Sequence, residues 1–291
     1  MTANSAPRPS FLFIGAAKSG STWIHDALSE HPSVFIPRAK DLQFFDYQYD
    51  LGLDWYLQNF EKAGTAQALG ELSHDYYLSA DAARRIRQDL PDVRLICCLR
   101  EPGDFAVSVL RWWHSHTRRF GSTFREMAGN PHFTNLLAYR KNLEIYFDLF
   151  PADQIRVVFY EQLKADPQRF ITDLYRFIGV DPSYQPTVLA GRSNVTRPPR
   201  SRAFLIFAVA AADLLRRMGA ANLVGAVKRN RFFDKLVYSG NRRSEDSCVK
   251  VELDRIADSV RERTAGDMEA LAQLIGKPVP AEWFETAGQR T

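Results

Sequence analysis

The sequence has little cysteine, no long apolar run and only a small excess of positive charge, and each shortage excludes a class of protein. Three cysteines among 291 residues cannot form a disulfide framework, and they lack the spacing of a zinc site. The longest strictly apolar stretch, Ala203–Ala212, is too short to span a bilayer, and the polar N-terminus does not resemble a secretory signal. We therefore expect a soluble protein of a reducing compartment, the cytoplasm.

The composition is that of an ordinary globular protein, with 45% hydrophobic and 25% charged residues. This balance excludes a disordered chain, a coiled coil and a collagen-like repeat. The net charge is +4, but residues 192–243 carry twelve Lys or Arg side chains against two acids. Such an asymmetry favours an acidic or phosphorylated partner, while the lack of a recognisable docking motif argues against nucleic acid.

Short apolar runs alternate with longer segments of helical period, which predicts an α/β fold with a mostly parallel central sheet between layers of helices. The expected strands are Ser10–Gly15, Ala66–Leu72, Val93–Leu99 and Gln154–Tyr160. Helices are expected to begin at Ser21–Thr22 and Pro102, and to occupy Asp81–Leu90, Asn135–Phe150, Pro167–Ile178, Ser201–Met218 and Val249–Ile275. We expect residues 1–291 to form one domain, with a core over about 10–205 and a helical extension over about 206–291.

The segment Phe11–Leu28 has the features of a phosphate-binding loop. An apolar strand leads into small residues, a lysine and a pair of hydroxyl residues before a helix begins. Small residues let backbone N–H groups approach an anion, and the helix N-terminus and the lysine add positive charge. The hydroxyls of Ser21 and Thr22 supply donors and can also cap the helix. The candidate phosphate-binding residues are Lys18, Ser19, Gly20, Ser21, Thr22 and Trp23.

The loop differs from the Walker motif of nucleoside triphosphate enzymes. Gly15 and Gly20 have the Walker separation, but Ser21 follows the second glycine and the lysine lies two residues before it, at Lys18. A P-loop kinase or nucleotide hydrolase is therefore the alternative rather than the first prediction. It would require ATP and magnesium.

The stretch AAKSGSTWIHDALSEHPSV, at residues 16–34, resembles the 5′-phosphosulfate loop of sulfotransferases that use 3′-phosphoadenosine-5′-phosphosulfate (PAPS). The resemblance implies a P-loop-like architecture that needs neither a triphosphate nor a metal. It implies that Lys18 and the backbone of Ser19–Thr22 hold the 5′-phosphate. It also implies that Lys18 offsets charge on the bridging oxygen as the sulfuryl group leaves.

A second positive site is expected for the other phosphate of this donor. Arg100 follows an apolar strand, at the edge where α/β sheets bind ligands, and Ser108 follows two helical turns later. The planar donors of an arginine match phosphate geometry, and a serine hydroxyl adds one more donor. Residues 94–114, RLICCLREPGDFAVSVLRWWH, resemble the family's 3′-phosphate site, which implies these two roles.

Two further segments resemble the family. Residues 157–179 are similar to its fourth-strand and helix block. Residues 192–202 are similar to a late loop that closes over the nucleotide in many members, so one or two of Arg197, Arg200 and Arg202 are expected to face phosphate. The resemblance covers about residues 10–205, and its pattern is closest to bacterial and glycan-type members.

Two residues are candidates for the base that takes the acceptor's proton. Asp41 lies in RAKDLQFFD, which resembles the K-E-x-x-F-F segment of glycan sulfotransferases, where a glutamate takes this role. His74 lies in GELSHDYY, at the place of the catalytic histidine of many cytosolic sulfotransferases. An ordinary pKa of about 6.5 suits a base near neutrality and favours His74 slightly. Leu72 stands where the family has a second lysine. The second catalytic lysine is therefore missing, unless Lys40 serves in its place.

The predicted function is the transfer of a sulfuryl group from PAPS to a hydroxyl, with an amine as second choice, of a glycan, lipid or small metabolite. No metal is expected, because His114 and His116 point in different directions on a predicted helix. Besides the kinase, the alternative is a PAPS-binding protein with reduced catalysis. Such a protein would touch a membrane surface through Ala203–Arg217 and the basic residues that follow. The sequence leaves the oligomeric state open.

Overall fold

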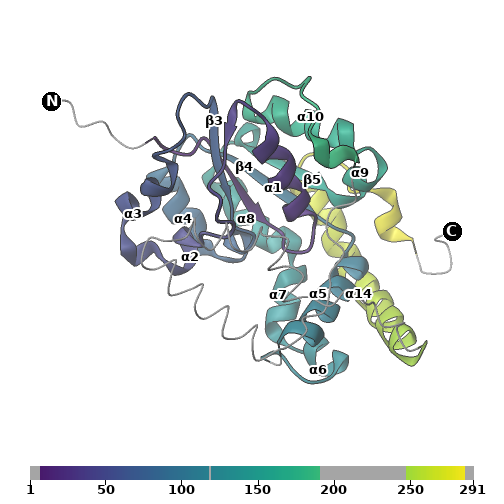
Figure 1. Ribbon diagram of the computed structural model, residues 1–291. Coiled ribbons are helices and arrows are strands. Elements are labelled where there is room, and N and C mark those ends of the chain that lie inside the picture. The colour runs from purple at the N-terminus through teal and green to yellow at the C-terminus, as the bar shows by residue number, and fades with distance from the viewer. Residues whose placement is uncertain (1–6, 118, 191–246, 286–291) are drawn as a thin grey trace.

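A parallel sheet in the order β2-β3-β1-β4-β5 forms the centre of the computed structural model, which describes residues 7–117, 119–190 and 247–285 (Figure 1). The strands are β1 (Phe11–Gly15), β2 (Val34–Phe35), β3 (Ala68–Leu72), β4 (Arg94–Leu99) and β5 (Ile155–Phe159), and every pairing is parallel. The four predicted strands are confirmed. The sequence did not predict β2, because a two-residue strand is too short to show a periodicity.

Both faces of the sheet are buried, and successive side chains alternate between them. Along β1, Phe13 packs in one hydrophobic cluster and its neighbour Ile14 in the other. The same alternation explains the adjacent cysteines of β4, since Cys97 and Cys98 belong to opposite clusters. Both thiols are free and buried, so the two cysteines serve as small core residues.

Helices cover both faces of the sheet and complete three layers (Figure 1). On one face lie α1 (Ser21–Glu30), α9 (Tyr160–Ala165) and α10 (Pro167–Ile178). On the other lie α4 (Ala80–Asp89), α5 (Pro102–His116), α8 (Tyr139–Leu149) and α14 (Ser247–Leu274). This arrangement confirms the predicted three-layer α/β fold.

Short helices and 3₁₀ turns fill the connections. The short helices are α2 (Phe44–Tyr47), α3 (Leu53–Leu57), α6 (Phe124–Ala128) and α7 (Pro131–Leu137). The 3₁₀ turns are η1 (Tyr49–Leu51), η2 (Gln58–Phe60), η3 (Tyr76–Leu78), η4 (Ala152–Gln154), η5 (Thr187–Ala190) and η6 (Ala281–Phe284).

The predicted single helix Asn135–Phe150 is wrong, because the chain breaks between α7 and α8. Ala138 has ψ of 60°, outside the helical range, and separates the two helices. The side chain of Asn142 donates to the carbonyl oxygen of Asn135 across the break, at 2.7 Å. This side-chain bond replaces part of the backbone hydrogen bonding that the break interrupts. A polar residue among the apolar positions of the predicted helix therefore marks the break.

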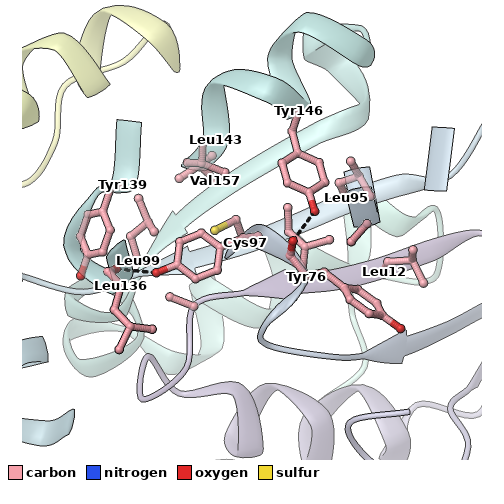
Figure 2. Packing of buried hydrophobic residues seen from close by; sticks show 14 of the residues in the cluster. Leu12, Tyr76, Leu95, Cys97, Leu99, Leu136, Tyr139, Leu143, Tyr146 and Val157 are labelled. Atoms are coloured by element: carbon pink, nitrogen blue, oxygen red, sulfur yellow. Dashed lines mark hydrogen bonds between the residues drawn. The ribbon is translucent and has the colours of Figure 1, made fainter. Parts of the chain in front are cut away.

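Buried tyrosines tie α7 and α8 to the loops at the end of the sheet (Figure 2). Tyr146 donates to the carbonyl oxygen of Tyr76 at 2.7 Å, and Tyr77 donates to that of Leu136 at 2.5 Å. Tyr139 donates to the carbonyl oxygen of Arg100 at 2.9 Å. Because a buried hydroxyl requires a partner, these bonds fix the segments that follow β3 and β4.

The C-terminal helix α14 shares the core of the sheet. Its Leu253, Val260 and Leu271 are fully buried in the cluster that also contains residues of β4 and β5. Trp283, in η6, packs edge-on against Phe159 of β5, with 5.2 Å between ring centroids. The helix predicted at Val249–Ile275 is thus present, and it is an integral part of the packing.

Several predictions fall on residues outside the described ranges. They concern the helix Ser201–Met218, the membrane-contacting segment Ala203–Arg217 and the late-loop arginines Arg197, Arg200 and Arg202. In the ranges that are described, no helix is both long and apolar enough to cross a membrane.

Candidate functional site

The loop between β1 and α1 has the backbone of an anion-binding turn. Lys18 and Gly20 have positive φ angles of 60° and 87°, which turn the chain sharply from the strand into the helix. The N-cap of α1 is Gly20, which has no side chain, so no side-chain hydrogen bond caps the helix. The prediction that Ser21 or Thr22 caps the helix is therefore wrong, and the first turn keeps the positive polarity that attracts an anion.

The second glycine of the loop leaves no room for a side chain. A Cβ at Gly20 would lie 2.9 Å from a methyl carbon of Leu163 and 3.1 Å from the ring of Tyr160. The left-handed φ also favours glycine here. The loop therefore packs directly against α9, which brings its backbone close to the end of β5.

Two lysines converge on this loop. Lys40 Nζ donates to the hydroxyls of Ser21, at 2.9 Å, and Thr22, at 3.2 Å. Burial, followed by the positive charges of Arg100 and Lys40, lowers the pKa of Lys18 to about 8. Burial also lowers the pKa of Lys40. Arg100 and Lys40 disfavour the charged form of Lys18, and a bound anion would stabilise it, which is the electrostatics of a phosphate site.

Lys40 is the site residue that the sequence analysis named only as a substitute for a missing lysine. It comes from the loop between β2 and α2, where the Asp41 amide donates to the carbonyl oxygen of Leu72 at the end of β3, and β3 pairs with β1. The sequence signal was its place at the lysine of the K-E-x-x-F-F-like segment, beside Asp41. Its contact with the phosphate loop depends on strand order, which a local motif does not encode.

Arg100 lies beside the same loop because β4 pairs with β1 on the other side. The crevice between β1 and β4 is the point where strand order reverses, and there α/β sheets bind ligands. Arg100 Nη1 lies 3.4 Å from the carbonyl oxygen of Lys18, and the guanidinium carbon lies 4.8 Å from the ring centroid of Tyr160. Among the described residues, its buried Nε has no hydrogen-bond partner, a deficit that a phosphate oxygen would remove.

The other predicted nucleotide contacts lie on the loop, on α1 and on α5. Ser108 is half-buried on α5, two turns beyond Arg100. Ser19 is fully buried and its hydroxyl donates to the carbonyl oxygen of Ala17 at 3.3 Å, so it stabilises the loop itself. The ring of Trp23 packs edge-on against Phe170 of α10, with 6.2 Å between centroids, so its side chain belongs to the packing of α1.

The two candidate bases, Asp41 and His74, contact each other. His74 Nδ1 and Asp41 Oδ1 are 2.6 Å apart, and His74 Nε2 lies 3.6 Å from Asp75 Oδ1. Burial alone lowers the pKa of His74, but the charges of Asp41 and Asp75 and the hydrogen bond to Asp41 outweigh it and raise the pKa to about 9. The expected ordinary pKa of His74 is therefore wrong. At neutral pH this imidazole is a cation between two carboxylates.

The loop that carries Asp41 is strained and is held by a buried network. Asp41 and Gln43 have φ of 59° and 53°, a left-handed conformation that costs energy outside glycine. Ser73 Oγ accepts from the Gln43 amide at 3.0 Å and donates to Glu71 Oε2 at 3.1 Å. Tyr76 Oη accepts from the Phe44 amide at 2.9 Å and donates to Glu71 Oε1 at 2.5 Å.

Glu71 anchors this network from β3. It is only 1% exposed, and burial, opposed by the hydrogen bonds from Tyr76 and Ser73, raises its pKa to about 8. A buried carboxyl that satisfies two hydroxyls, which in turn hold two backbone amides, fixes the loop in one conformation. The sequence analysis missed Glu71. The signal was a single charged residue inside the otherwise apolar predicted strand Ala66–Leu72.

The histidines of α5 do not form a metal pair. The ring of His116 stacks on Trp112, with 5.1 Å between centroids, and that of His114 lies 4.7 Å from the ring of Phe124. Over residues 7–117, 119–190 and 247–285, no group of three or more His, Cys, Asp or Glu side chains could hold a metal ion.

The comparisons with known proteins agree with this geometry. A family model described as "Sulfotransferase domain" matches residues 8–192. The chain belongs to the sulfotransferase domain family. Its α14 and η6 lie beyond the matched region.

Curated relatives of this sulfotransferase domain include two large bifunctional enzymes. The chain is 29% identical over 202 residues to bifunctional heparan sulfate N-deacetylase/N-sulfotransferase 3 of Homo sapiens, covering 60% of this chain and 23% of that protein. It is 26% identical over 221 residues to the corresponding Drosophila melanogaster enzyme, covering 62% and 20%. The chain thus spans less than a quarter of the length of these relatives.

A solved structure shares the fold. The crystal structure of a sulfotransferase from Alicyclobacillus acidocaldarius superposes with a TM-score of 0.57 at 24% identity. The match covers 75% of this chain and 96% of that one.

Proposed function

We propose that this sulfotransferase domain transfers a sulfuryl group from PAPS to a hydroxyl or amino group of an acceptor. The observation that carries the proposal is the convergence of Lys18, Lys40 and Arg100 on an uncapped helix N-terminus at the strand-order reversal. When bound, PAPS supplies the sulfuryl group, and adenosine 3′,5′-bisphosphate (PAP) is the product that leaves.

Each cation has a separate role in the proposal. Lys18 and the first turn of α1 hold the 5′-phosphate, and Lys18 and Lys40 offset the negative charge that grows on it as the S–O bond breaks. Arg100 and Ser108 hold the 3′-phosphate, with the buried Nε of Arg100 as one donor. One or two of the late-loop arginines, Arg197, Arg200 and Arg202, complete this contact. No metal takes part.

Asp41 is the proposed base. At neutral pH its partner His74 is protonated, so the carboxylate and not the imidazole is ready to take a proton. The acceptor O–H or N–H bond breaks as its oxygen or nitrogen bonds to sulfur. The proton goes to Asp41, and the electrons of the breaking S–O bond go to the leaving phosphate. His74 holds the carboxylate in place.

The surroundings of the base favour a neutral or weakly cationic reacting group on the acceptor over an anionic one. Asp75 lies beside His74, and burial raises the pKa of nearby Asp46 to about 6. These carboxylates give the acceptor end negative potential. The N-sulfotransferase names of the relatives add support for an amine. We therefore give equal weight to an amine and to a hydroxyl as the reacting group of a glycan, lipid or small metabolite. A cytoplasmic location stays a prediction.

The proposal is tested first by ligand binding and then by turnover. PAP at a hundred times its Kd should stabilise the protein by about 2.7 kcal/mol, in EDTA as well as in magnesium. PAPS with a panel of amino and hydroxyl glycans should then yield PAP. Stabilisation by ATP only with magnesium would support the kinase instead. PAP binding without turnover on any acceptor would favour the PAPS-binding protein of reduced catalysis.

A further inference from the structure

Helix α14, which lies outside the family match, reaches the nucleotide end of the site through Arg261. Its Nε lies 3.1 Å from Glu101 Oε1, and its Nη2 lies 3.0 Å from Glu101 Oε2. Glu101 directly follows Arg100 in the chain. A bidentate guanidinium–carboxylate pair therefore links the C-terminal helix to the residue next to the proposed 3′-phosphate anchor.

Glu101 has a structural task that makes its charge hard to remove. It is the N-cap of α5 and accepts from the amides of Gly103, at 2.9 Å, and Asp104, at 2.7 Å. Its side chain is 1% exposed, whereas that of Arg261 is 13% exposed. A carboxylate buried this deeply needs a positive partner, and Arg261 supplies one from another element.

Asp104 places Arg261 and Arg100 in competition for one carboxylate. Its Oδ1 lies 3.4 Å from Arg261 Nη2, and its Oδ2 lies 3.8 Å from Arg100 Nη2. The shorter contact is to Arg261, which Asp258 also orients from the same helix at 2.8 Å. Arg261 therefore offsets the charges of Glu101 and Asp104, of which Asp104 would otherwise draw the guanidinium of Arg100 away from a phosphate.

The packing at Gly103 shows that the site is shaped for this guanidinium. A Cβ at Gly103 would lie 2.7 Å from Cζ of Arg261. The first turn of α5 can thus carry no side chain at this position while Arg261 keeps its place.

We propose that Arg261 is a positioning residue for nucleotide binding, which neutralises Glu101 and Asp104 and so keeps Arg100 available to the 3′-phosphate. The inference rests on the proposed function, since it takes Arg100 as a phosphate ligand. It assigns to the C-terminal helix a role in donor affinity, although Arg261 itself does not touch the nucleotide.

The experiment measures PAP affinity by calorimetry, and KM for PAPS and kcat by turnover, in Arg261→Gln and in a matched control. The control is Arg263→Gln, an exposed position on the same helix whose Nε donates to the Ser259 carbonyl oxygen of its own helix turn. We expect Arg261→Gln to weaken PAP binding and raise KM for PAPS about tenfold, with kcat changed less than about twofold. Arg261→Lys should fall between, and Arg263→Gln should bind as the wild type does.

A charge rescue separates this role from a merely structural one. Asp104→Asn, at a position 38% exposed, removes the carboxylate that lies beside both arginines, without deep burial of an amide. In an Arg261→Gln background it should recover most of the lost PAP affinity. Equal affinity of wild type and Arg261→Gln, or no recovery in the double variant, would overturn the inference while the proposed function stands. If Arg261→Gln fails to fold, Arg261→Lys with and without Asp104→Asn decides. Failure of the wild type to bind PAP would instead refute the proposed function.

Discussion

The two ends of the site carry opposite charge, although one peptide bond joins them. Lys40 faces the basic end, beside the phosphate loop with Lys18 and Arg100, whereas Asp41 faces the acidic end and His74. Asp41 has a left-handed backbone, and at this residue the chain passes from one end to the other. In the proposed function, this contrast separates the charge that holds the leaving anion from the charge that takes the acceptor's proton.

The basic end is broken most severely by Lys18→Ala. This substitution removes a buried cation where negative charge grows during transfer, so kcat/KM should fall by about 10²–10³-fold. PAP affinity should fall with it. Lys62→Ala, which removes an exposed lysine far from the loop in sequence, is the control and should leave both quantities unchanged. Retention of full PAP affinity in Lys18→Ala would show that the loop does not bind the nucleotide.

At the acidic end, we expect Asp41→Asn to lower kcat rather than PAP affinity. Without a carboxylate to accept the proton, kcat should fall about a hundredfold, while PAP affinity stays within about twofold of the wild type. Asp75→Asn removes the more distant carboxylate, 3.6 Å from His74, and should cost much less. A larger kcat loss in His74→Gln than in Asp41→Asn would reverse the assignment of the base.

The two ends should also titrate separately. Lys18 loses its proton as pH rises through about 8, so PAP affinity is greatest below pH 8 and falls above it. His74 keeps its proton until about pH 9, so kcat at saturating donor should be flat between pH 6.5 and 8 if Asp41 is the base. A neutral His74 acting as base would instead make kcat rise about tenfold per pH unit over that range. Parallel pH profiles of binding and turnover would mean that one group governs both.

Local patterns singled out Lys18 and Arg100 for the basic end of the site, because each follows an apolar strand within a short segment, whereas Lys40 comes from a third segment. A strand, a run of small residues, Lys18 and a helix start define the loop within a short segment, and Arg100 follows an apolar strand. Strand periodicity and the rule that ligands bind at carboxyl ends of strands were then sufficient to bring the two motifs together. The three-layer fold followed from the same alternation of strands and helices.

Long-range contacts account for what the sequence did not predict. The raised pKa of His74 depends on Asp41, 33 positions away, and the Arg261–Glu101 pair spans 160 positions. At the helix break, the side chain of Asn142 and the hydroxyl of Tyr77 bond the carbonyl oxygens of Asn135 and Leu136, which the periodicity of the segment does not reveal. Such features require the tertiary structure, since no local pattern encodes which charge lies beside which.

The acidic end also depends on how firmly its loop is held, which Tyr76→Phe tests. The variant removes the hydroxyl that joins Glu71 to the Phe44 amide, so it should lower the free energy of unfolding by about 1–2 kcal/mol.

Tyr146→Phe is the matched control, because it too loses a buried hydroxyl. The Tyr146 hydroxyl donates to the backbone carbonyl oxygen of Tyr76, so its loss leaves the bonds to the Asp41 loop intact. Both variants should lose similar stability, measured by urea unfolding. Only Tyr76→Phe should lower kcat, by a few-fold, with PAP affinity unchanged, since the loop that it loosens carries the proposed base. Equal kcat in the two variants would mean that the strained loop holds its conformation without the Glu71 network. The network would then contribute to stability alone.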